Sequence, residues 1–165
     1  AYNNRISGDR SIGHVELTLI RVADSRLGNT EVVKNPDGIE LTYSSRTRSI
    51  VDAVYDWSRF GSLPHAFGWI RADFTHARIS TSDLVSATLD FGNQGTIRRI
   101  GCVLDMLYDQ RKNAASPIPL RLIARLERSI RCSTSTIPLI PTLAKRGRVN
   151  KRWGIVVNGT IPSIA

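Results

Sequence analysis

Two stretches near the start of the chain alternate apolar and polar side chains, as half-buried strands do. Residues 15–22 and 39–43 show this alternation and are rich in β-branched side chains, and residues 35–38, Asn-Pro-Asp-Gly, give a turn signal before the second stretch. Period-two alternation places the apolar side chains on one face of a strand. The pattern therefore predicts a small antiparallel sheet in this part of the chain.

From Ser45 onward, apolar residues recur at the spacing of helices instead. The predicted helices cover residues 46–57, 63–76, 81–87, 96–110 and 120–131. Ser45 and Ser80 stand directly before two of them, where a serine hydroxyl can accept a hydrogen bond from the first turn. The longest apolar periodicity belongs to residues 96–110, so we expect this segment to be the central, buried helix.

Strands first, helices in the middle and an apolar strand near the end predict the α+β class. We expect a helical core with a small N-terminal antiparallel sheet and a C-terminal strand or hairpin. With 165 residues, 41% of them hydrophobic, the chain suits one packed domain over residues 1–165 better than two large ones. The predicted core residues are Ile50, Val54, Ile97, Ile100, Leu104, Leu107, Leu126, Ile130 and Trp153.

The two cysteines change this picture little. Cys102 and Cys132 have no companions at metal-ligand spacing, and no apolar segment of the secretory-leader kind accompanies them. We therefore expect both to be small core residues of a protein from the reducing cytoplasm. No apolar run approaches the roughly 20 residues that cross a bilayer, so no membrane partner is expected.

Charge is distributed unevenly along the chain, whose net charge is +9. Residues 1–90 hold 10 basic and 11 acidic side chains, whereas residues 91–165 hold 13 basic and 3 acidic ones. A strong positive excess attracts polyanions but carries no information about the fold. We expect any polyanionic partner to meet the second half of the chain.

Basic side chains gather in two places in that half. On the predicted helix 120–131, arginines lie opposite the apolar side with only Glu127 between them: Arg121, Arg125, Arg128 and Arg131. The second group precedes the apolar residues 153–157: Lys145, Arg146, Arg148, Lys151 and Arg152. A solvated helix face usually mixes both signs, and guanidinium groups suit phosphate geometry.

We expect residues 139–157 to form two strands joined by this basic loop. If the loop and the arginine stripe share a face, they would hold the phosphates of duplex DNA without reading its sequence. Two alternatives remain open at this point. In the first, the stripe is an ordinary solvated helix face, and in the second, the loop is an ordinary solvated turn.

The sequence offers no arrangement of residues suited to catalysis. A nucleotidyltransferase needs paired carboxylates behind a Gly-Ser turn, and none follow residues 61–62. Asp37 and Glu40 approach the acid pair of a nuclease, but Thr42 stands where its lysine belongs. The histidines fall on separate predicted elements: His14, His65 and His76. We expect no enzymatic activity, no cofactor and no bound metal.

Four segments follow one another in a recognisable order. Residues 45–52 include Ser45 and the run Arg-Ser-Ile-Val-Asp, Gly61 precedes the second helix, residues 98–107 read RRIGCVLDML, and residues 152–158 read RWGIVVN. Together they resemble the AbiEi-family antitoxins, the regulator half of bacterial type IV toxin–antitoxin and abortive-infection systems. The first segment departs from the family's pattern at three positions: Arg46, Thr47 and Ser49 replace Pro, Glu and Thr.

The resemblance implies a C-terminal antitoxin domain that counters a nucleotidyltransferase-like toxin and contributes to DNA-binding transcriptional autoregulation. Family members carry an N-terminal winged helix-turn-helix, and we expect this DNA reader to be absent, since no recognition-helix pattern precedes residue 15. The resemblance also implies that the chain is no enzyme. It links the chain functionally to a cognate toxin and leaves direct contact with that toxin open.

A second class of function competes with this one. The basic surface would instead belong to a protein-interaction module that meets an acidic partner or a second copy, without binding DNA. At the positions matched to the family, we expect structural roles. Asp52 should pair with an arginine or a backbone N–H, Trp153 should pack beneath the basic loop, and Asn158 should bond its neighbouring backbone.

Overall fold

The computed structural model describes residues 2–110, 118–131 and 135–163. It combines helices with several small sheets, which confirms the α+β class. The sequence predicts one domain, whereas the contacts within the chain divide it into two compact units, Ala1–Ser44 and Ser45–Ala165. The division has a physical reason, because the first unit is built from backbone ladders and Ile20 is its one buried hydrophobic side chain among the described residues.

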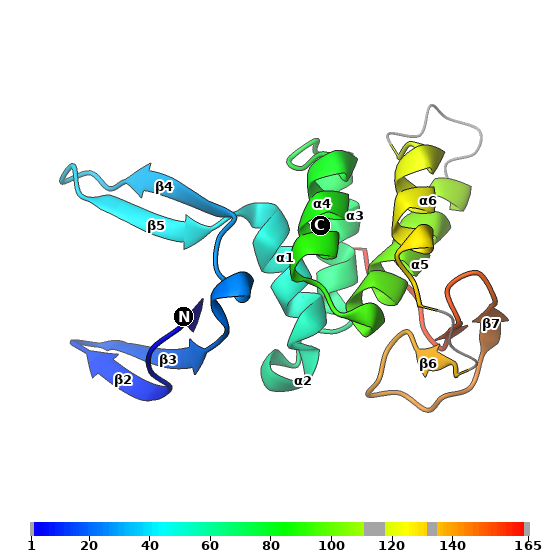
Figure 1. Ribbon diagram of the computed structural model, residues 1–165, viewed down its shortest axis with the longest axis horizontal. Helices are drawn as coiled ribbons and strands as arrows, with labels where there is room; N and C mark the ends of the chain where they lie inside the picture. The colour runs from blue at the N-terminus through cyan, green and yellow to red at the C-terminus, as the bar shows by residue number, and fades with distance from the viewer. Residues whose placement is uncertain (1, 111–117, 132–134, 164–165) are drawn as a thin grey trace. The chain divides into compact units, whose positions relative to one another are not determined.

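The first unit contains two separate ribbons of strands (Figure 1). Strands β1 (Tyr2–Asn3), β2 (Gly8–Ile12) and β3 (Val15–Arg21) form a sheet in the order β1-β3-β2, in which β2 is antiparallel and β1 parallel to β3. Strands β4 (Thr30–Lys34) and β5 (Glu40–Ser44) form an antiparallel hairpin. Both predicted strands exist, as β3 and β5, but each pairs with the strand before it rather than with the other.

The second unit contains the helices, and its element order follows the prediction. They are α1 (Arg46–Tyr55), α2 (Trp57–Phe60), α3 (His65–Thr75), α4 (Thr81–Phe91), α5 (Gln94–Gln110) and α6 (Leu120–Arg128). Both predicted caps are present: the hydroxyl of Ser45 accepts from the Arg48 N–H at 3.1 Å, and that of Ser80 from the Asp83 N–H at 3.0 Å. Helix α6 ends earlier than predicted, which leaves Arg131 beyond it.

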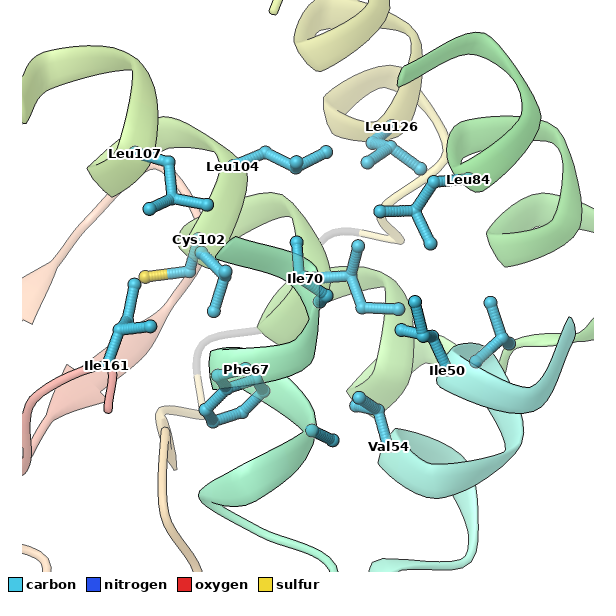
Figure 2. Packing of buried hydrophobic residues seen from close by; sticks show 14 of the residues in the cluster. Ile50, Val54, Phe67, Ile70, Leu84, Cys102, Leu104, Leu107, Leu126 and Ile161 are labelled. Carbon is cyan, nitrogen blue, oxygen red and sulfur yellow. The ribbon is translucent and has the colours of Figure 1, made fainter. Parts of the chain in front are cut away.

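Side chains from five of these helices converge on one core, as Figure 2 shows. Helix α5 lies at its centre, with Ile100 and Leu104 fully buried. The predicted core residues are buried, apart from Ile130, which is partly buried against the cluster. Cys102 is buried as predicted, and burial, with a smaller effect of Asp105, raises the pKa of its thiol to about 12. Cys132 lies outside the described residues.

A small sheet completes the second unit. Its strands are β6 (Ile137–Pro138), β7 (Arg148–Asn150) and β8 (Ile155–Val157), in the order β6-β8-β7. Strands β7 and β8 form an antiparallel hairpin, and β6 runs parallel to β8. The predicted single basic loop is therefore wrong: Lys145 and Arg146 precede β7, Arg148 lies within it, and residues 151–154 form the turn. A short turn between paired strands needs fewer residues than the prediction assigned to it.

None of the described helices is long and apolar enough to cross a membrane.

Trp153 joins this sheet to the helical core. The residue is 1% exposed, and the benzene edge of its indole lies against the backbone of α5 at Gly101. A Cβ atom at Gly101 would collide with that ring. Glycine is required here for close approach, since its position in the middle of a 17-residue helix needs no unusual φ.

Replacing Gly101 with alanine should destabilise the protein by about 1 to 3 kcal/mol, because the added methyl group overpacks a closed contact. Urea unfolding followed by circular dichroism measures the change. In a Trp153→Leu background the same substitution should cost at least about 1 kcal/mol less, since the ring atoms it meets are gone. Equal costs in both backgrounds would show that the indole does not constrain position 101.

Candidate nucleic-acid interface

Arg98, Gly101 and Asp105 share one face of α5, at the spacing i, i+3 and i+7, and this face holds the β7–β8 turn. The guanidinium of Arg98 donates from Nε to the Trp153 carbonyl at 2.7 Å, and from Nη2 to the Gly154 carbonyl and, at 2.9 Å, to that of Ser135. Burial lowers the pKa of Arg98. Carbonyl oxygens, rather than carboxylates, thus satisfy the guanidinium of a residue that is 7% exposed.

Asp105 accepts hydrogen bonds from two side chains of the same turn. Its Oδ2 accepts from the indole N–H of Trp153 at 3.1 Å, and its Oδ1 accepts from Nη1 of Arg152 at 2.8 Å. Arg152 also donates from Nη2 to Oε2 of Glu127 on α6 at 2.6 Å. The hydrogen bond to Glu127 is the largest effect that raises the pKa of Arg152. Arg152, predicted to contact DNA, is thus held between two carboxylates and links α5 to α6.

The arginine stripe of α6 is exposed as predicted. Its members are Arg121, Arg125, Arg128 and, beyond the helix end, Arg131. Ile123 and Leu126 are fully buried on the opposite side of the helix. Arg125 makes one long hydrogen bond to the hydroxyl of Ser86, at 3.4 Å. The stripe is therefore available to an external anion.

The remaining cations of the C-terminal segment are also exposed: Lys145, Arg146, Arg148 and Lys151. The ammonium of Lys145 donates to the Thr136 carbonyl, which fixes its stem near the start of β6. Arg148 and Lys151 line a cavity of about 620 Å³ between β7 and the C-terminal half of α5. Its other lining residues are Met106, Asp109, Val149, Asn150 and Val157. The carboxylate of Asp109 makes this cavity mixed in charge rather than purely basic.

The Arg152–Glu127 ion pair brings the two basic groups together. Glu127 directly precedes Arg128 on α6, and Arg152 directly follows Lys151 in the hairpin turn. Because the pair spans 2.6 Å, the C-terminal end of the stripe must lie beside that turn. Arg121 stands at the other end of the helix, farther from the hairpin.

The residues of α1 that belong to the resembling segment 45–52 have structural roles. Nε of Arg48 donates to Oδ2 of Asp52 at 2.7 Å, one turn along the helix, which confirms the pairing predicted for Asp52. The guanidinium of Arg48 also lies 3.8 Å from the ring centre of Phe91, so it joins α1 to α4. Arg46 donates to both oxygens of the buried Asp73, at 2.5 and 2.7 Å, and this bonding raises the pKa of Arg46.

Asn158 makes backbone bonds, but not to its neighbours as predicted. Its amide accepts from the Ile140 N–H and donates to the Ile140 carbonyl, both at 2.9 Å, and donates to the carbonyls of Leu143 and Ala144 at 3.4 and 3.1 Å. The pairing of β6 with β8 causes this difference, because it brings residues 140–144 beside the end of β8. The side-chain amide of Asn158 therefore holds the loop of residues 140–144, which lies 14 to 18 residues away in the chain.

No group of three or more His, Cys, Asp or Glu side chains within the described ranges is placed to hold a metal ion. The scan against family models found no match, and neither did the searches of curated proteins and of solved structures. The likeness to AbiEi antitoxins thus stays a prediction from sequence motifs. Spacing could have revealed the polar face of α5, since Arg98 and Asp105 lie two helical turns apart on the predicted helix.

Replacing Arg98 with lysine keeps the charge but removes the fork that reaches three carbonyls. We expect a loss of about 1.5 to 3 kcal/mol in the free energy of unfolding, the range for hydrogen bonds to charged groups. The matched control is Arg121→Lys on the exposed stripe, expected within about 0.5 kcal/mol of the parent. Chemical denaturation measures both, and equal stability of the two variants would contradict the structural role of Arg98.

Proposed function

We propose that residues 45–165 act as an antitoxin domain that holds duplex DNA through its phosphates and counters a nucleotidyltransferase-like toxin in the bacterial cytoplasm. The DNA-binding part rests on one observation: the Arg152–Glu127 ion pair, at 2.6 Å, keeps the stripe of α6 beside the β7–β8 hairpin. The antitoxin part rests on the sequence resemblance. Two of the resembling segments, around Arg98 and Trp153, contact each other directly.

The proposed DNA surface consists of eight exposed cations: Arg121, Arg125, Arg128, Arg131, Lys145, Arg146, Arg148 and Lys151. None of them forms an ion pair with a carboxylate in the part of the chain that the structure describes. Each is therefore free to replace a counterion of a phosphate. Arg152 is assigned a different role, because it positions the hairpin by pairing its charge with Asp105 and Glu127.

Contacts of this kind recognise charge and spacing but not base identity. Exposed side chains on a helix face and a hairpin suit phosphate oxygens, and contacts to phosphates position a protein on duplex DNA without reading its bases. Specific operator choice would then come from elsewhere in the regulatory assembly. We infer that this surface adds non-specific affinity, which falls steeply as salt rises.

The protein should bind random-sequence duplex DNA with a Kd of about 1 to 100 μM at physiological salt. Replacing Lys145, Arg146 and Arg148 together with alanine should reduce the slope of log affinity against log salt by about two to three units, if each meets a phosphate. Fluorescence anisotropy at several salt concentrations gives the slope.

The control variant removes three exposed cations elsewhere, Arg5, Arg10 and Arg59, and therefore changes net charge equally. Its slope should stay close to the parental one. Equal effects of the two triple variants on the slope would show that the overall positive charge of the protein, rather than this surface, binds the DNA. An unchanged slope in the Lys145, Arg146 and Arg148 variant, with tight binding to an acidic protein surface, would favour the protein-interaction module instead.

Antitoxin activity has a separate test. If the gene beside the one for this chain encodes a nucleotidyltransferase-like toxin, co-expression of the two proteins should restore growth to cells that the toxin alone arrests. The Arg98→Lys variant serves as the matched loss-of-stability control and should protect less well, in proportion to its folded fraction. Continued arrest in the presence of abundant folded protein would remove the antitoxin part of the proposal and leave the DNA surface untouched.

A further inference from the structure

The hairpin of β4 and β5 is a sheet of only two strands, and every residue of both strands is exposed. A two-stranded hairpin is at best marginally stable in water, and independent stability takes further strands or a surface packed against it. Because all of its strand residues stay exposed, the part of the chain that the structure describes does not supply this cover. The hairpin therefore has the form of an element that packs against another molecule.

One face of this hairpin is apolar. The register places Val33 opposite Leu41 and Glu31 opposite Tyr43, and alternate residues of a strand point to the same side. Ile39 lies on that side too, because the pairing continues one step beyond β5 toward the turn. The four apolar side chains, which form the apolar hairpin face, are 38 to 57% exposed: Val33, Ile39, Leu41 and Tyr43.

The opposite face of the hairpin is mostly polar. Its residues are Thr30, Val32, Lys34, Glu40, Thr42 and Ser44. Lys34 and Glu40 form an ion pair across the strands at 3.4 Å. A sheet with one polar and one apolar face normally keeps the polar face in water and packs the apolar face on a second layer. The described chain contains the solvated layer of such an arrangement and not the layer that covers it.

Charge decides what kind of layer fits. In the hairpin, which the structure describes in full, Glu31 is the one charged residue on the apolar side, and it stands at the end away from the turn. The centre of the face thus offers no charge to an acidic or a basic partner. A second copy of the same face matches it, since both are apolar in the centre. If the strands of the two copies run antiparallel, their Glu31 carboxylates lie at opposite ends and do not repel each other.

The size of the hairpin limits the strength of such a contact. Residues 30–44 provide fifteen residues a side, whereas interfaces of standard size take roughly 20 to 30 residues a side. We therefore expect a weak dimer, with a Kd of about 10 to 100 μM. Each copy carries a net charge of +9, so the two copies repel each other at long range and salt should strengthen their association.

We propose that the apolar hairpin face is a self-association site, on which the same face of a second copy packs with its strands antiparallel. Two such hairpins form two layers of two strands at the usual spacing of about 10 Å, with eight apolar side chains between them. The polar faces, each with its Lys34–Glu40 ion pair, remain in water. The site goes beyond the proposed DNA surface and shares no residue with it.

Sedimentation equilibrium of the whole chain without DNA, over concentrations that span the expected Kd, tests this site. Leu41→Lys puts a charge in the centre of the apolar hairpin face and should weaken the dimer about tenfold or more, because the ammonium group would lose its water. Thr42→Lys is the matched control, since it adds the same charge at the next residue on the polar face. Its dimer Kd should stay within about twofold of the parent.

A second variant protects the test against loss of the hairpin itself. Threonine keeps the strand preference of the residues that it replaces, so Val33→Thr combined with Leu41→Thr should preserve the hairpin and still weaken the dimer. NMR amide exchange of residues 30–44 shows whether the hairpin is retained. Unchanged association in this variant, with the hairpin intact, would overturn the site.

The parent protein gives two further outcomes that would contradict self-association through this face. One is a monomer at every concentration and salt level. The other is a dimer that weakens as salt rises, which would indicate contacts between opposite charges instead. DNA binding by the same protein weakens with salt, so the two activities respond in opposite directions. A monomeric protein that still binds duplex DNA would remove this site and leave the DNA surface standing.

Discussion

The contact between Trp153 and the glycine at position 101 determines where the C-terminal sheet lies. A large indole can reach the backbone of α5 only because Gly101 has no side chain. Asp105 then holds the indole N–H, and Arg98 holds the carbonyls of residues 153 and 154. These bonds are specific in direction, so they fix the turn as well as the ring. The cations of the hairpin take their places from this arrangement, since β7 and β8 meet at the same turn.

The same arrangement explains why counting basic residues overstates the basic surface. Of the cations between residues 91 and 165, Arg98 and Arg99 are buried and Arg152 is held by Asp105 and Glu127. Their sequence neighbours, including Lys151, are exposed or apolar. The local sequence cannot distinguish buried and paired cations from exposed ones, because the partners of Arg98 and Arg152 lie 25 to 56 residues away in the chain. Burial near carbonyls leaves positive charge inside the domain, where screening by salt is weak.

The parts of the fold that could be predicted are those governed by local rules. Helical periodicity and serine caps located α1, α4 and α5, because both act within one or two turns. Strand β2 was not predicted, because its residues do not alternate between apolar and polar side chains. It is a strand because its backbone pairs with β3. In the site, helical spacing gave the exposed stripe of α6. The roles of Asn158 and Arg152 depend on contacts between distant segments and could not be read from spacing.

The motif residues that resemble the antitoxin family make internal bonds rather than an exposed site. Arg98 binds carbonyls, Gly101 admits an indole, and Asn158 closes residues 140–144 against β8. Residues of this kind specify how a domain folds whatever it binds, so a resemblance carried by them is an argument about architecture first. Function must then be argued from groups whose donors are not used within the domain. By that criterion the exposed arginine stripe of α6 is the place where an anion changes the energy of the molecule most.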